Sequence, residues 1–178
     1  MIPLFLGLTA VNMLLLAGVF GLGLGATDAQ GRPAALFALH ITLGITSGLV
    51  CALTHSAVYT YFMATSRWLQ AAADKADLDP ARFVAGALAR KTRALLVALA
   101  AILLTGAAMF AGAGTDPTMN RLWPPEVHWL LAASALAVNL ASAWIEFGLI
   151  GDQGRLMDKV LAILNAAPDV GIKKTAAP

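Results

Sequence analysis

The stretch that decides the fold reads PAALFALHITLGITSGLVCALTHSAVYTYFMATS, residues 33–66, and it contains no Asp, Glu, Lys or Arg. A second apolar stretch, residues 125–150, reads PEVHWLLAASALAVNLASAWIEFGLI. Because about 20 apolar helical residues cross the roughly 30 Å hydrocarbon layer of a bilayer, each stretch is long enough to span a membrane. Ionisable side chains are costly inside a bilayer and therefore indicate functional positions. The two stretches hold His40, His55, His128 and Glu146.

The whole chain has the composition of a membrane protein. Of its 178 residues, 59% are hydrophobic and 12% are charged, whereas about 25% of the residues of an average soluble domain are charged. The single cysteine, Cys51, excludes a disulfide framework and the CxxCH attachment motif of c-type haem. The net charge of +2 comes from basic residues near the membrane ends, so it does not indicate nucleic-acid binding.

We predict an all-α integral membrane protein, a four-transmembrane-helix up-and-down bundle that forms a single domain over residues 1–165. Hydrophobic runs bounded by turn residues give the spans. The predicted spans are residues 2–26, 33–66, 94–114 and 125–150.

Local signals predict where the helices begin and how the chain ends. Proline suits the first helical position, so we expect helices to start at Pro33 and at Pro80, the latter capped by Asp79. An apolar stripe in residues 155–165 predicts a short separate helix on the membrane surface. Residues 166–178 are small and polar and are expected to form a flexible tail.

The distribution of Lys and Arg predicts the orientation. Ten of the 12 lie between the second and third spans or after the fourth, and the other two are Arg32 and Arg121. Short connections rich in Lys and Arg stay on the cytoplasmic side of a membrane. We therefore expect both termini to be cytoplasmic, in a bacterial cytoplasmic (inner) membrane.

Polar residues form a stripe along the second span and another along the fourth. At about 100° per residue, His40 and His55 share a helix face with Gly44 and Gly48. On the fourth span, one face carries His128, Ala132, Ala135, Asn139, Ser142 and Glu146. His40 and His128 lie near the starts of their spans and are predicted to face each other at one level. His55 and Glu146 lie deeper and form a possible second level.

This placement resembles transmembrane four-helix b-type cytochromes, in which histidines on two helices hold haem b and nearby glycines make room for the ring. The resemblance is carried by His40, Gly44, Gly48 and His55 on the second span and by His128 on the fourth. It implies a haem b cofactor, axial metal ligands at His40 and His128, and electron transfer within the membrane.

Glu146 departs from that pattern, because a two-haem protein of this kind would place a second histidine on the fourth span. His55 and Glu146 are therefore either part of the cofactor site or an ordinary hydrogen-bonded or ionic pair. The same alternative holds for His40 and His128, since a membrane histidine often only bonds across helices.

Two further functions fit the same sequence. The many Gly and Ala residues favour a cofactor-free structural or oligomerising subunit of a membrane complex. Alternatively, Asn139, Ser142, Glu146 and His55 line a pathway for protons or a small solute. Motifs of nucleotide-binding proteins and hydrolases are absent, so whether the chain is an enzyme stays open. The expected partners are the lipid bilayer, a quinone or redox partner complex, and copies of itself or a larger assembly.

Overall fold

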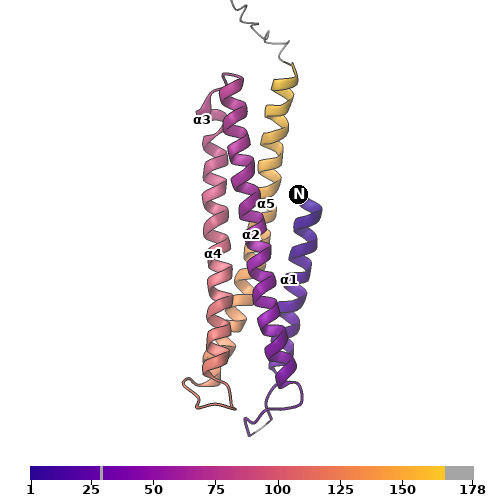
Figure 1. Cartoon of the computed structure of the whole chain (residues 1–178), viewed down its shortest axis with the longest axis vertical. Helices are drawn as coiled ribbons and strands as arrows, with labels where there is room; N and C mark the ends of the chain where they lie inside the picture. Colours follow the sequence, from indigo (N-terminus) through magenta and orange to yellow (C-terminus); the bar gives the residue numbers. More distant parts are fainter. Residues whose placement is uncertain (29, 167–178) are drawn as a thin grey trace, which may run out of the picture.

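Long helices make up most of the chain in the computed structural model, which describes residues 1–28 and 30–166 (Figure 1). The elements are α1 (Ile2–Gly23), α2 (Phe37–Lys75), α3 (Pro80–Phe83), α4 (Ala85–Gly114) and α5 (Pro125–Ala166). Four helices, with α3 and α4 taken together as one, are long and apolar enough to cross a membrane. The predicted all-helical fold with four such helices is therefore confirmed.

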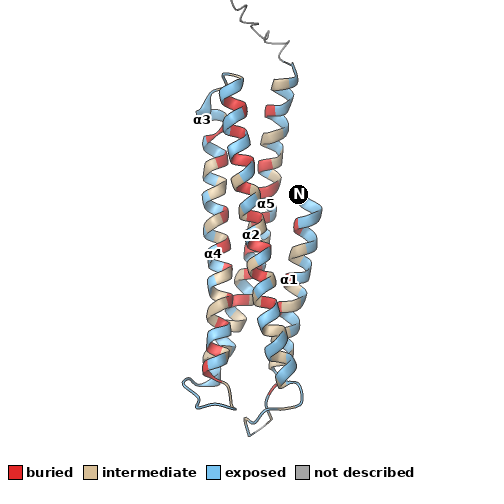
Figure 2. Cartoon of the chain, in the orientation of Figure 1, coloured by how far each residue is buried: buried red, intermediate tan, exposed pale blue. Residues whose placement is uncertain are grey.

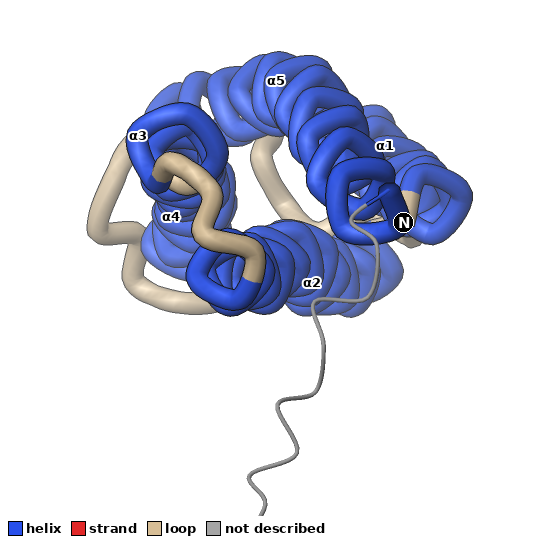
Figure 3. Tube along the Cα trace, turned by 90° about the horizontal axis from the view of Figure 1, so that it is seen from above, coloured by secondary structure: helices blue, strands red, loops and turns tan. Residues whose placement is uncertain are grey.

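The four long helices alternate in direction and form a ring. Viewed along the bundle, α1 lies between α2 and α5 on one side, and α4 lies between them on the other (Figure 3). Helices α2 and α5 thus face each other across the interior. Both connections α1–α2 and α4–α5 lie at one end of the bundle, which we call the loop end (Figure 1).

The start of α2 corrects one prediction. Pro33 does not begin the helix, because it pairs with Thr27 in a short antiparallel bridge, and α2 starts only at Phe37. The Asp28 side chain accepts hydrogen bonds from the backbone N–H groups of Gln30 and Arg32 and closes this turn. The second predicted start is confirmed: Asp79 caps α3 by accepting from the Ala81 N–H, and Pro80 is its first residue.

Helices α2 and α5 run well past the predicted spans. Residues 155–165 were expected to form a separate surface helix, but α5 continues without a break to Ala166. The reason is that the apolar stripe has a protein partner. Val160 is fully buried, and Leu156 packs with it against Leu69, Ala72 and Ala87 of α2 and α4. Beyond the N-terminus of α1, the chain therefore forms a three-helix extension with its own core (Figure 1). Most of the predicted tail, residues 167–178, lies outside the described residues.

The outside of the bundle is rich in large apolar side chains, and its interior holds polar side chains together with buried apolar ones. Large apolar side chains such as Leu14, Leu49 and Leu103 are exposed on the outside. Buried residues occur along all four long helices (Figure 2), and they include polar side chains such as Asn139 and Glu146. This distribution is compatible with a bundle whose surface meets lipid, because hydrocarbon solvates apolar side chains but leaves polar groups unsatisfied.

Candidate functional site

The structure brings His40 and His128 together near the loop end. His40 lies in the first turn of α2, and His128 lies in the first turn of α5, so the two side chains meet from opposite sides of the ring of helices. Their ring centroids are 5.9 Å apart, and the ring planes are inclined at 76°. Both residues are only partly buried. We call these two residues the histidine pair.

Each ring of the histidine pair is oriented by a backbone carbonyl of the preceding helix. His40 Nδ1 lies 3.1 Å from the Val19 oxygen of α1, and His128 Nδ1 lies 2.9 Å from the Ala108 oxygen of α4. A carbonyl can only accept, so each Nδ1 carries the proton. In a neutral ring the other nitrogen, Nε2, then holds a lone pair. Among the described residues, neither Nε2 has a hydrogen-bond partner.

Glycines of the neighbouring helices make room for these rings. A methyl group added at Gly23 would lie 3.0 Å from Cε1 of His40, and one added at Gly112 would lie 3.1 Å from Cε1 of His128. Contacts this short force the ring to move, so only glycine leaves both imidazoles where they are. The sequence stripes gave no sign of these two glycines, because each lies on a different helix from the histidine it faces.

The two glycines predicted beside the ring have different surroundings. A Cβ at Gly44 would touch only Val19, at 3.9 Å, whereas a Cβ at Gly48 would lie 2.3 Å from Sδ of Met109. The space at Gly48 is therefore filled by a flexible thioether side chain, which adapts easily to a new neighbour.

The spacing of the histidine pair suits two ligands on opposite sides of one metal ion. Metal–imidazole bonds are about 2 Å long, so two rings that bind one ion from two sides would have their centroids about 6 Å apart. Metal-bound histidines typically donate their second ring N–H to a carbonyl or carboxylate, as both members of this pair do. The two histidines therefore have the donor chemistry to hold a metal ion, such as the iron of haem b. No group of three or more His, Cys, Asp or Glu side chains able to hold a metal ion occurs within residues 1–28 and 30–166.

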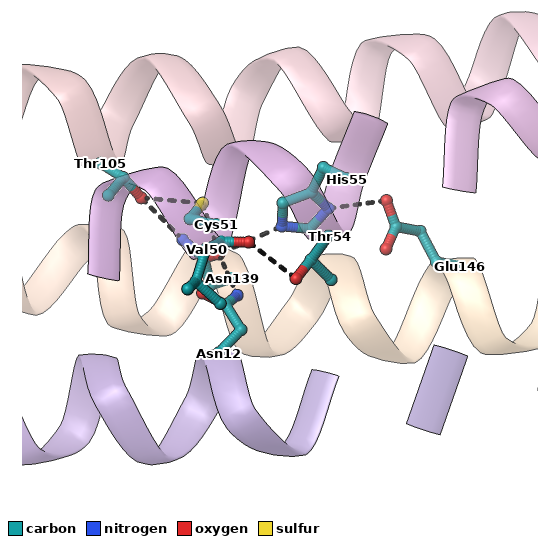
Figure 4. Close-up of polar contacts among 8 residues, drawn as sticks. All are labelled: Asn12, Val50, Cys51, Thr54, His55, Thr105, Asn139 and Glu146. Carbon is teal, nitrogen blue, oxygen red and sulfur yellow. Dashed lines mark hydrogen bonds and ion pairs between the residues drawn. The ribbon is translucent and has the colours of Figure 1, made fainter. Parts of the chain in front are cut away.

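Deeper in the bundle, a second polar group joins all four long helices (Figure 4). We call it the Asn139 cluster, and its members are Asn12 of α1, Cys51 and His55 of α2, Thr105 of α4, and Asn139 and Glu146 of α5. All six are buried. The deeper level predicted for His55 and Glu146 therefore includes partners from helices α1 and α4.

Asn139 is the hub of this cluster. Its Nδ2 group donates to the Ala135 carbonyl at 2.9 Å and to Thr105 Oγ1 at 3.0 Å. Because the Ala135 carbonyl can only accept, the amide orientation is fixed and Oδ1 faces the other side. There Oδ1 accepts from Asn12, Cys51 and His55 at 3.1 to 3.3 Å.

His55 uses both of its ring nitrogens in this cluster. Nε2 lies 3.1 Å from Asn139 Oδ1 and must donate to it, while Nδ1 lies 2.8 Å from Oε1 of Glu146. A second proton is therefore shared between His55 and Glu146, as an ion pair or as a neutral hydrogen bond. With both nitrogens occupied, His55 has no lone pair to offer a metal. The other carboxylate oxygen of Glu146, Oε2, is buried without a hydrogen-bond partner among the described residues.

A third polar contact lies in the three-helix extension, and the sequence analysis did not find it. Gln153 of α5 is fully buried, donates to Thr65 Oγ1 at 3.0 Å, and accepts from Arg90 Nε at 2.9 Å. Glutamine on an otherwise mixed helix face carries no distinctive signal. This contact joins α2, α4 and α5 on the side of their apolar core that is nearer the loop end.

Comparison with known proteins adds no relative to this picture. The chain matches no protein-family model, no curated protein and no solved structure.

Proposed function

We propose that the chain is a small integral-membrane b-type cytochrome that holds one haem b between α2 and α5, with His40 and His128 as the axial ligands. One observation carries the proposal. Two imidazoles face each other at 5.9 Å, each oriented through Nδ1 by a carbonyl and each with Nε2 unpaired. A neutral ring nitrogen with a free lone pair is what a metal ligand needs, and here two of them lie near one another.

The proposed orientation follows from charge. The three-helix extension carries most of the Lys and Arg residues, and the loop end carries only Arg32 and Arg121. By the positive-inside rule, the extension and both termini lie in the cytoplasm and the histidine pair lies near the outer surface. A bacterial cytoplasmic membrane is the setting that we propose.

Haem b would supply one-electron transfer between the bound metal and a donor or acceptor in the membrane, such as a quinone or a partner complex. The protein's own residues would hold and orient the two histidine rings. The Val19 and Ala108 carbonyls fix which ring nitrogen is free, and Gly23 and Gly112 keep both rings in place. Met109, which fills the space beside Gly48, would have to turn aside if a flat ring lay against that glycine.

The test is an absorption spectrum of the purified protein, oxidised and then reduced with dithionite. We expect a Soret band and one iron per chain. His40→Ala and His128→Ala should each remove the band, while His55→Asn should keep it, because His55 has no free nitrogen. A colourless protein, or a band that survives both alanine substitutions, would show that the histidine pair is no haem site.

A cofactor-free structural role is the second candidate, and a specific observation favours it. The two Nδ1–carbonyl bonds already join α1 to α2 and α4 to α5 without any ligand. Under this function the protein would purify colourless as a stable homo-oligomer or as part of a larger complex. The same spectrum therefore separates the two candidates.

A further inference from the structure

A cleft of about 160 Å³ opens between α2 and α4, next to the Asn139 cluster. Its α2 wall consists of His55, Ser56, Tyr59 and Thr60, and its α4 wall is apolar and includes Ala98 and Leu99. His55 is buried, whereas Ser56, Thr60 and Leu99 are exposed on the outside of the bundle. The cleft therefore runs from the lipid-facing surface to the edge of the Asn139 cluster.

The hydroxyl groups of this cleft differ from those of four threonines on α2. Thr42, Thr46, Thr54 and Thr65 each donate to the backbone carbonyl four residues earlier. Ser56, Tyr59 and Thr60 make no side-chain hydrogen bond with any described residue. An O–H group without a partner is unfavourable in an apolar environment. Three such donors around one cleft are a site for an acceptor that arrives from outside the chain.

The depth of the cleft restricts what can arrive. At 1.5 Å per residue, Ser56 lies about 28 Å along α2 from its start at Phe37. In a hydrocarbon layer of roughly 30 Å, this is the boundary farther from the loop end. A ligand must therefore dissolve in the bilayer and carry its polar atoms near the interface.

We infer that this cleft binds the ring of a lipid-soluble quinone. A quinone ring is flat and carries acceptor oxygens that match the three free hydroxyl donors. The cleft has about the volume of a cavity that accepts one benzene ring, roughly 150 Å³. The quinone tail would leave through the lipid-facing opening beside Thr60 and Leu99. The inference depends on the membrane location proposed above but not on haem, because the cleft shares no residue with the histidine pair.

The experiment measures saturable binding of a decyl-tailed benzoquinone to the purified full-length protein in lipid nanodiscs. Tyr59→Phe and Thr60→Val each delete one cleft hydroxyl with little change in shape. Each should weaken binding about fivefold to tenfold, the typical effect of one lost hydrogen bond. The matched controls are Tyr61→Phe and Thr46→Val, which delete hydroxyls on the same helix outside the cleft and should leave the affinity unchanged.

Two further measurements keep the outcome clear. The double variant His40→Ala with His128→Ala, which cannot hold the proposed haem, should bind the quinone as the parent protein does. Ala98→Phe, which fills the cleft, should abolish binding while the thermal midpoint confirms that the variant is folded. Equal affinities for cleft and control variants would overturn the inference and indicate that a lipid acyl chain occupies the cleft. Loss of quinone binding in the double histidine variant would also overturn it, by moving the site to the loop end.

Discussion

At the loop end of the bundle, His40 and His128 each use one ring nitrogen for a backbone carbonyl and leave the other unpaired. Deeper along α2, His55 uses both ring nitrogens for side chains of α5. The same residue type therefore does two different jobs on one helix. A free Nε2 is what the proposed ligand role requires, whereas a ring with both nitrogens bonded ties helices together.

The surroundings of the two levels differ in the same way. Gly23 and Gly112 face the histidine pair and carry no side chain that could bond to the ring nitrogens. Asn139 and Glu146 face His55 and satisfy it completely. The inner level is buried within the bundle and has no water to replace a lost partner, so removing a neighbour there should disturb the fold more than at the partly buried loop end.

The largest expected effect comes from breaking the inner pair on one side. Glu146→Leu leaves His55 buried without its acceptor, and we expect the free energy of unfolding to fall by about 3 to 5 kcal/mol, as for other half-removed buried pairs. His128→Leu removes only one carbonyl bond and should lower it by about 1 kcal/mol in the haem-free protein. Unfolding in SDS, monitored by circular dichroism, measures both.

The double variant His55→Leu with Glu146→Leu is the control for this prediction. It removes both polar partners, so much of the lost stability should return, because well-packed apolar residues often replace a buried pair without a penalty. If the double variant were as unstable as the sum of the two single ones, the pair would not be coupled and the contrast between the two levels would fail.

Much of this architecture could be predicted from the sequence, because it depends on the length of the apolar segments and on the periodicity of the α-helix. The four long apolar helices and the Asp79-Pro80 helix start follow from hydropathy and cap chemistry. The helical rise per residue also predicted His40 at the depth of His128 and His55 near the depth of Glu146. The structure brings both pairs together. These inferences needed only the rise and turn of an α-helix.

The rest depends on contacts between segments distant in sequence. The apolar stripe of residues 155–165 has the same sequence pattern whether it packs against lipid or against protein. Only its contacts with Leu69 and Ala87 show that it packs against protein. The hub role of Asn139 likewise needs Asn12 and Thr105 from two other helices. The start of α2 was misplaced because the Asp28 turn outcompetes the helix-starting preference of Pro33. No single-segment pattern contains this information.

A smaller effect should follow from adding one methyl group beside His128. In Gly112→Ala the new carbon meets His128 Cε1 at 3.1 Å, so the ring must shift, whereas in Gly106→Ala on the same helix the new carbon meets nothing within 4 Å. We expect Gly112→Ala to weaken haem retention or shift the Soret maximum, and Gly106→Ala to change neither. Both variants should keep the Asn139 cluster intact, which is measured as a free energy of unfolding in SDS that is unchanged to within about 1 kcal/mol. Identical spectra for the two variants would mean that Gly112 does not position His128.

The smallest expected effect lies in the turn that leads into α2 and hence to His40. The backbone N–H of Arg32, followed by its side chain, holds the pKa of Asp28 below the usual 3.8. The folded-state pKa is thus lower than the unfolded one, so Asp28 stabilises the turn above pH 3.8 and loses this contribution as the pH falls through the folded-state value. The carboxylate is partly exposed to solvent, so the effect should be confined to the turn. Carbon-13 NMR should show Asp28 titrating below 3.8, and in Asp28→Asn the amide signals of residues 30–32 should lose their acid-dependent shift while those of the Asn139 cluster stay unchanged. Titration at or above 3.8 would show that the turn is not closed by this carboxylate, and the late start of α2 would then need another cause.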